Sequence, residues 1–483
     1  MSRIITNIPS MLAQRVLREQ NNTLNTTLAR LSTGFRINRG ADDPAGLIAS
    51  ENLRAEKTAI STAIGNAERA DQVVNIAEGG LTEISSLLQD LQSLVGQSAN
   101  EAGLSTEEKK ANQLQIDSIL QTIDRIANST SFAGVKLLNG TFDYTTSNVT
   151  LTELSEIKVD AAKVPTDSFI GVTADVTQSA QTGQVFLSAG TANTLSGTSL
   201  TVEVAGNLGL QQFTFASGTA GTAIVSAVNT FKDVTGVSAS ISGAYVQLDS
   251  TSFGSSQFAS VTKVSGDAAY DTAINTTAAP AGSTTAKDLG RDIGLTINGQ
   301  SASADGLTAQ ISTGSLAVSV TVATAFNDSG NNSTFQITGG GANFSLSPRL
   351  DLAGKASLGI APVTTGRLGS AANGRLSALN SGGASNVIDG DVGSAQLIVE
   401  DAIKSVATTR GRLGSFQTNT IGATIRALGV SLENTAAAES SIRDTDFAAE
   451  TASLTRAQIL VQAATSILTL ANAQPQNVLS LLG

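Results

Sequence analysis

The 483-residue sequence contains no cysteine, no histidine and no tryptophan. Without cysteine the chain can form no disulfide and offers no thiolate ligand, so an extracellular form has to be stabilised by packing alone. Without histidine it lacks the commonest zinc and iron ligand and the side chain that titrates most readily near neutral pH. We therefore expect no enzyme, and no bound metal or cofactor.

Charged residues are also scarce, at 14% of the chain against about 25% in ordinary globular domains. The formal net charge is −11 and lysine and arginine form no cluster, so we expect neither nucleic acid nor an anionic membrane as a partner. No stretch reaches the roughly 18 uninterrupted apolar residues of a membrane span. The first ten residues lack the apolar core of a cleavable signal peptide, so we expect any export to leave the chain uncleaved.

What the sequence does contain is a heptad pattern near each end. Small or apolar residues in alternating steps of three and four predict a long helix over about residues 55–100 and another from about residue 392. The first stripe consists of Ile60, Ala63, Ala67, Ala70, Val74, Ala77, Leu81, Ile84, Leu88, Leu91 and Val95. The second consists of Ala395, Val399, Ala402, Val406, Thr409, Leu413, Phe416, Thr420, Ala423, Ala427 and Val430. We expect these two stripes to pack against each other within one chain.

Two further helices flank this pair, over residues 8–35 and from Asp446 onwards, where Pro475 is expected to end the helix. A Gly- and Pro-rich break over residues 34–46 follows the first of them. Each has one narrow apolar stripe and needs a partner, which we expect in another copy of the chain. The adjacent Asp42 and Asp43 in the break could be a carboxylate pair for a metal or for acid-base chemistry, but turn hydrogen bonding is the favoured interpretation.

The middle of the chain changes period. Ser105 and Glu108 predict a capping box that opens a helix ending near Asn128. From about residue 141, Thr/Val/Ser/Gly runs alternate as strands do, for example over residues 199–204, 237–249 and 316–322, with one helix over 222–231. Residues 201–266 and 295–346 share a similar order of elements, a hint of an internal repeat. Residues 368–385 have the composition of a linker.

The fold predicted from these patterns is α+β and multidomain. Both termini form a long antiparallel coiled-coil rod, and a β-rich central domain is looped out.

Several motifs then resemble those of bacterial flagellins. At the start they are residues 2–10 (SRIITNIPS), 31–38 (LSTGFRIN) and 41–47 (ADDPAGL). At the end they are residues 444–450 (DTDFAAE), 456–460 (RAQIL) and 475–479 (PQNVL). The resemblance implies a structural subunit that self-assembles into the flagellar filament for motility, is exported through the flagellum's own channel and ends outside the cell. The alternatives are the hook-filament junction protein, or a filament subunit whose central domain binds glycans or surfaces.

The resemblance also implies a division of the chain. Residues 1–45 with 440–483 would be inner-core terminal helices, residues 46–175 with 386–439 a helical rod plus hairpin, and residues 176–385 a variable outer domain. Partners would be further copies of the chain, an export chaperone, the filament cap and the junction proteins. The residues expected to carry self-assembly are Ile4, Ile8, Leu17, Leu24, Leu28, Leu31, Phe447, Leu454, Val461, Leu468, Val478, Leu479, Leu481 and Leu482.

Gln89, Asp90 and Leu94 occupy the positions at which many flagellins are recognised by Toll-like receptor 5. The family motif usually has arginine where this chain has Asp90, and a carboxylate should weaken contact with a surface built for a cation. We therefore expect weak receptor activation. Leu94 matches the motif.

Overall fold

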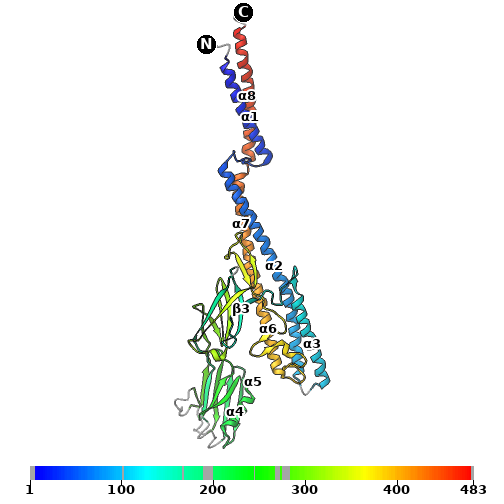
Figure 1. Cartoon of the computed structure of the whole chain (residues 1–483), viewed down its shortest axis with the longest axis vertical. Coiled ribbons are helices and arrows are strands. Elements are labelled where there is room, and N and C mark those ends of the chain that lie inside the picture. Colours follow the sequence, from blue (N-terminus) through cyan, green and yellow to red (C-terminus); the bar gives the residue numbers. More distant parts are fainter. Residues whose placement is uncertain are drawn as a thin grey trace. The chain divides into compact units, whose positions relative to one another are not determined.

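The computed structural model describes residues 6–100, 103–165, 168–188, 199–243, 245–266, 272–274 and 283–479. The fold is α+β and divides into two compact units (Figure 1). The terminal unit comprises Met1–Ala70, Ser345–Gly354 and Thr418–Gly483, and the central unit comprises Asp71–Phe344 and Lys355–Gln417. Helix α2 (Pro44–Ser98) contributes residues to both.

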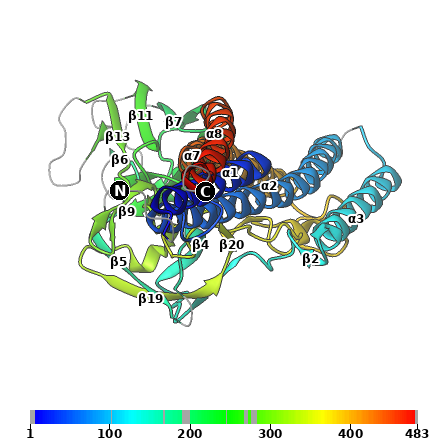
Figure 2. The same cartoon turned by 90° about the horizontal axis from the view of Figure 1, so that it is seen from above.

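The terminal unit is built from helices. Helix α1 (Ile8–Thr33) lies antiparallel to α8 (Phe447–Leu479), and the two are side by side in Figures 1 and 2. Asn7 caps the start of α1 by accepting a hydrogen bond from the Ser10 amide, and Gly34 ends it with a φ of +76°, a left-handed conformation that suits glycine. The first part of α2 pairs with α7 (Gly422–Arg443) through Lys57 and Glu439 at 3.1 Å and through Glu51 and Arg443 at 3.4 Å.

Two predicted helix boundaries were wrong. Helix α2 begins at Pro44 and not near residue 55, because proline fits the first turn of a helix and the Asp43 carboxylate accepts a hydrogen bond from the Gly46 amide at 2.9 Å. Helix α8 continues through Pro475 to Leu479. A proline removes one backbone hydrogen bond and can bend a helix without ending it.

The predicted apolar stripe of α2 is confirmed over its whole length. All eleven of its residues from Ile60 to Val95 are at most 2% exposed. In the central unit α2 lies antiparallel to α6 (Val392–Ser415), with Arg410 Nε 2.7 Å from Glu78 Oε1 and Gln417 bonded to Asp71. The predicted pairing of the two heptad helices within one chain is therefore correct here.

The second stripe is confirmed only from Ala395 to Leu413. Beyond Leu413 the helix passes through a π-helical segment, η4 (Phe416–Ile421), before α7 begins. A π turn holds one residue more than an α turn and so rotates all later residues by about 100°. Val430, predicted to face inward, is 59% exposed, and Ile421, which was not predicted, is completely buried.

A third helix, α3 (Thr106–Ser129), completes the helical part of the central unit. The predicted capping box is present: the Glu108 amide donates to Ser105 Oγ and the Ser105 amide donates to Glu108 Oε2. Three short elements accompany these helices. Strand β1 (Ser131–Phe132) pairs with β2 (Val135–Lys136), and β22 (Gly369–Ser370) pairs with β23 (Gly374–Arg375). The third is the 3₁₀ helix η3 (Leu376–Leu379).

The stretch expected to be a linker is docked on α3. Asp117 accepts hydrogen bonds from the amide and hydroxyl of Ser381, and Gln113 bonds both the Leu379 carbonyl (2.7 Å) and the Val387 amide (2.9 Å). Leu376 and Leu379 are completely buried. Glycine and serine content predicted a linker, but the hydrogen bonds of Asp117 and Gln113 fix the backbone of this segment.

The β-rich region of the central unit consists of two modules, each with its own apolar core between two antiparallel sheets. The sheets of the inner module have the strand orders β16-β17-β18-β4 and β15-β14-β5-β19-β3. Those of the outer module have the orders β12-β6-β10-β9 and β13-β11-β7-β8.

The strands of the inner module are β3 (Tyr144–Ser147), β4 (Leu154–Ala162), β5 (Ile170–Gln178), β14 (Gly294–Ile297), β15 (Gln300–Ser301), β16 (Ser303–Asp305), β17 (Thr308–Ser312), β18 (Leu316–Val322) and β19 (Asn332–Gly340), with the 3₁₀ helix η2 (Thr324–Phe326). Those of the outer module are β6 (Gln184–Ser188), β7 (Leu200–Gly206), β8 (Leu210–Phe215), β9 (Val237–Ser242), β10 (Tyr245–Ser250), β11 (Phe258–Ser265), β12 (Thr272–Ala273) and β13 (Thr285–Leu289), with helices α4 (Gly221–Thr230) and α5 (Lys232–Thr235). A last pair, β20 (Ala342–Ser345) and β21 (Lys355–Leu358), follows the inner module.

The two modules share one strand topology. In the inner module β4 pairs with β18, β18 with β17, and β5 with both β14 and β19. In the outer module β6 pairs with β10, β10 with β9, and β7 with both β8 and β11. The same six strands in the same order and pairing support the predicted internal repeat, but they change its alignment, since β7 corresponds to β5 and not to the strand at Leu295.

The outer module is inserted between β5 and β14, the inner strands that correspond to the β7–β8 hairpin. At the insertion point the Gln181 amide donates to the Arg291 carbonyl and the Arg291 amide donates to the Gln181 carbonyl, both at 2.8 Å. Because one copy interrupts the other, the order of elements along the sequence revealed only part of the repeat and aligned it incorrectly.

Replacing residues 182–290 with Asn-Gly should leave a folded inner module. Gln181 and Arg291 already form the hydrogen-bonded pair that closes a two-residue hairpin, and Asn-Gly is the preferred sequence for that turn. We expect the shortened chain to remain monomeric in solution, with the melting temperature of the inner module within about 5 °C of its original value, measured by circular dichroism. A chain that unfolds or aggregates on this deletion would contradict the nested arrangement.

Asp117→Asn should loosen the docked segment at neutral pH and not in acid. Burial raises the pKa of Asp117, but hydrogen bonds from Ser381 and Gln113 outweigh it and lower the pKa below the ordinary value. The stabilisation is therefore present above the unfolded-state pKa and is lost as the pH falls through the folded-state pKa. We expect hydrogen-exchange protection of the Ser385 and Val387 amides to fall about fivefold at pH 7, the equivalent of about 1 kcal/mol at this largely solvated site. Asp90→Asn, on the exposed face of α2, is the control and should change nothing there.

Candidate self-assembly surfaces

The seam between α1 and α8 is made of small residues. The buried side chains are Ser10, Ala13 and Thr27 on α1 and Ala457, Ala464 and Ala471 on α8. Polar contacts add to them: the Asn7 amide group donates to the Ala471 carbonyl at 2.8 Å, and Ser10 Oγ lies 2.7 Å from Asn472 Oδ1. Small side chains let the two helices approach closely, but they remove little apolar surface from water.

Six of the residues predicted for self-assembly border this seam and are half-buried by it, namely Leu17, Leu24, Leu31, Leu454, Val461 and Leu468. The expectation that α1 and α8 have no partner within the chain is therefore wrong, because each is the other's partner. The leucine heptad on α1 predicted which side of the helix makes the contact, but not that the partner is α8 of the same chain.

Larger apolar side chains lie on the outside of the same two helices. Between 39% and 66% of each of these side chains is exposed, and the set consists of Ile8, Met11, Leu12, Val16, Leu28, Phe447, Ile459, Leu460, Ile467 and Leu470. Ile8, Leu28 and Phe447 were predicted for self-assembly, and the other seven were missed. The available signal was that residues 459–461 and 467–468 are consecutive apolar residues, so α8 is apolar on more than one face.

The other five positions predicted for self-assembly lie near the ends of the chain. Ile4, Leu481 and Leu482 lie outside the described residues, as do the side chains of Val478 and Leu479 within α8.

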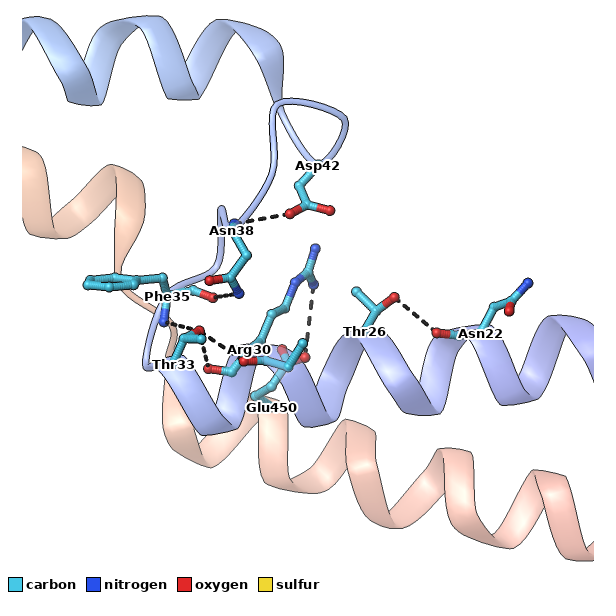
Figure 3. Close-up of polar contacts among 9 residues, drawn as sticks. Asn22, Thr26, Arg30, Thr33, Phe35, Asn38, Asp42 and Glu450 are labelled. Carbon is cyan, nitrogen blue, oxygen red and sulfur yellow. Dashed lines mark hydrogen bonds and ion pairs between the residues drawn. The ribbon is translucent and has the colours of Figure 1, made fainter.

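The turn between α1 and α2 is fixed by backbone hydrogen bonds to carboxylates (Figure 3). Asp42 Oδ2 accepts from the amides of Arg39 (2.8 Å) and Asn38 (3.0 Å), and these two hydrogen bonds lower the pKa of Asp42. Asp43 accepts from Gly46, so both carboxylates have the turn-forming role that was favoured over a metal or acid-base role.

The same turn is tied to the junction between α7 and α8. The Arg36 amide donates to the Arg443 carbonyl at 2.7 Å, the Thr445 amide donates to the Gly34 carbonyl at 3.0 Å, and the Arg443 guanidinium stacks over the Phe35 ring at 4.6 Å. Nearby, Arg30 on α1 lies 3.9 Å from Glu450 on α8 (Figure 3). These contacts hold α1 and α8 in register at the end away from the termini.

The receptor-motif positions lie on α2 as predicted. Leu88, Leu91 and Val95 are buried in the seam, Gln89 and Asp90 are exposed, and Leu94 is half-buried. The carboxylate of Asp90 thus lies on the accessible side of the helix.

No helix among the described residues is both long enough and apolar enough to cross a membrane. Residues 4–143 match the family model for the bacterial flagellin N-terminal helical region, and residues 397–482 match that for the C-terminal helical region.

Relatives match over the whole chain. Flagellin D of Vibrio anguillarum is 30% identical over 482 residues, covering 99% of this chain and 98% of the relative. B-type flagellin of Pseudomonas aeruginosa is 30% identical over 534 residues, covering 99% of each. Among solved structures, the flagellar junction protein FlgL of Legionella pneumophila is 12% identical with a TM-score of 0.27 and covers 82% of this chain and 99% of that one, a likeness too low to carry any argument. The chain belongs to the bacterial flagellins, the structural subunits of the flagellar filament.

Proposed function

We propose that this flagellin polymerises through the outward apolar faces of α1 and α8, formed by the ten exposed side chains described above. The observation that carries the proposal is the inversion of these helices: alanine, serine and threonine are buried between them while isoleucine, leucine, methionine and phenylalanine face solvent. A soluble monomer gains nothing from this arrangement. Neighbouring copies would cover these faces.

The size of the gain supports this role. Burying a large apolar side chain contributes about 1.5–3 kcal/mol, so even part of this set can offset the entropy lost on association. The small-residue seam then sets the distance between α1 and α8, and the large residues provide the contact between subunits.

The remaining parts of the chain have supporting roles in the same proposal. The terminal helices, residues 1–45 and 440–483, form the inner core; residues 46–175 with 386–439 form the surrounding helical layer; and residues 176–385 face the medium. Growth would involve an export chaperone, the filament cap and the junction proteins, with export of an uncleaved chain through the flagellar channel. The role is structural and involves no catalysis.

Ile459→Gln, Ile467→Gln and Leu470→Gln together should abolish filament growth. Glutamine keeps helix propensity and removes apolar surface only, so the monomer should keep its helical content. We expect the critical concentration for seeded polymerisation to rise at least about 100-fold, the effect of losing about 3 kcal/mol of apolar contact. Light scattering and electron microscopy would measure it. Seeded growth also separates a filament subunit from a junction protein, which should not elongate.

The matched control is Leu151→Gln, Leu210→Gln and Leu289→Gln in the β modules, where the three leucines are at least as exposed on average. It should polymerise normally. Equal loss of growth in both variants would show that general hydrophobicity, and not the α8 face, drives assembly.

We also propose that Toll-like receptor 5 recognises this flagellin weakly, because Asp90 presents a carboxylate where the family motif presents a cation. Asp90→Arg should therefore lower the concentration of monomer needed for half-maximal signalling by about tenfold in a receptor reporter cell, the effect of one additional charge-assisted hydrogen bond. Glu83→Arg, exposed on the same helix, is the control for net charge. Strong signalling by the unmodified monomer would refute this proposal.

A further inference from the structure

The π segment Phe416–Ile421 separates two possible apolar stripes on α7. The stripe that faces inward is Ile421, which is fully buried, followed by the half-buried Ile425, Leu428 and Leu432. Their spacing of four, three and four residues is that of a helical seam. It is displaced by one or two residues from the heptad pattern that continues from α6.

The second stripe is the unbroken continuation of the α6 heptads. After Leu413 it consists of Phe416, Thr420, Ala423, Ala427 and Val430, in steps of three and four. In the structure Ala427 and Val430 face solvent. The sequence from Phe416 to Leu432 therefore carries two alternative stripes, and the additional residue held in the π turn decides which of them is buried.

Two contacts in the central unit hold the π turn. Gln417 Nε2 donates to Asp71 Oδ1 at 2.8 Å and to Asn75 Oδ1 at 2.9 Å, while Asn75 donates to Asp71 Oδ2 at 3.0 Å. The ring of Phe416 packs on that of Phe344, with centroids 6.0 Å apart. If the helix became α-helical throughout, the residues after the turn would rotate. The hydrogen bonds donated by Gln417 would then no longer be needed to hold a π turn.

We propose that the α6–α7 helix is a two-register element, in which the Gln417–Asp71–Asn75 cluster stabilises the π register and its release turns the Ala423, Ala427 and Val430 stripe inward. The observed register dominates in the monomer because Ile421, Ile425, Leu428 and Leu432 are larger than the residues of the other stripe. Neighbouring copies in the filament meet a different outer face of α7 in each register, so assembly can shift the balance between the two. Release of the residue stored in the π turn would lengthen the α-helix by about 1.5 Å and rotate the residues after it by about 100°.

The absence of cysteine provides a direct test, since a single introduced cysteine is the only thiol in the chain. Leu428→Cys reports a half-buried position that becomes exposed in the second register. Its labelling rate should rise about tenfold when Gln417→Ala is added, because two ordinary hydrogen bonds are lost. An unchanged rate would overturn the proposal.

Local unfolding of α7 would also raise this rate, and a deletion distinguishes the two. Removing Thr418 from the Gln417→Ala variant takes out the additional residue and restores steps of three and four from Leu413 through Phe416, Ile421 and Leu428. The observed face is then inward in an uninterrupted α-helix, so the labelling rate of the Leu428→Cys thiol should return to the original value. Continued fast labelling would mean that the helix unfolds and does not change register. Circular dichroism of each variant verifies that it is folded.

Discussion

The seam of α2 is the interaction on which the rest of the structure depends. Eleven residues in steps of three and four, from Ile60 to Val95, are all removed from water, and they supply the inner side for α7 in the terminal unit and for α6 in the central unit. The first four of these residues are one isoleucine and three alanines, whereas the stripe from Leu81 to Leu91 consists of leucine and isoleucine.

The two nested β modules each bury apolar residues in a core of their own between their own two sheets. The two are joined by polar contacts, namely the Gln181–Arg291 pair and Asp292, which accepts from Ser255 and Gly306, and by Phe253 of the outer module, which packs against the inner core. On the helical side, Arg412 of α6 fastens the inner module by donating to the carbonyls of Asp160 and Gly359. A module joined through one hydrogen-bonded pair can vary in size without disturbing the strands that precede it, and the family models match only the two ends of the chain.

The sequence predicted the features that depend on strong periodicity and missed those that depend on a choice between partners. The α2 stripe, the Ser105 capping box and the strands near Val202 and Val318 follow from local pattern and are confirmed. The phase change after Leu413 could not be seen, because Phe416, Ala423 and Val430 continue the heptads without a break and no local pattern marks the π segment. The seam of α1 was missed for a related reason: Ser10, Ala13 and Thr27 score as polar or neutral, while the leucines that mark the helix as amphipathic lie at its border.

The seam between the terminal helices α1 and α8 differs from that of α2 in the size of its residues. A seam that contains large residues, such as the part of α2 from Leu81 to Leu91, removes much apolar surface from water and binds its partner tightly. A seam of alanine, serine and threonine, as between α1 and α8, removes less apolar surface from water and contributes less free energy. In the proposed assembly, α1 and α8 would become fixed when other copies cover Met11, Val16, Ile459 and Leu470. Placing large apolar residues on the outside and small ones on the inside makes the stability of these two helices depend on the concentration of neighbours, which is the property required of a subunit that must be soluble alone and permanent in a filament.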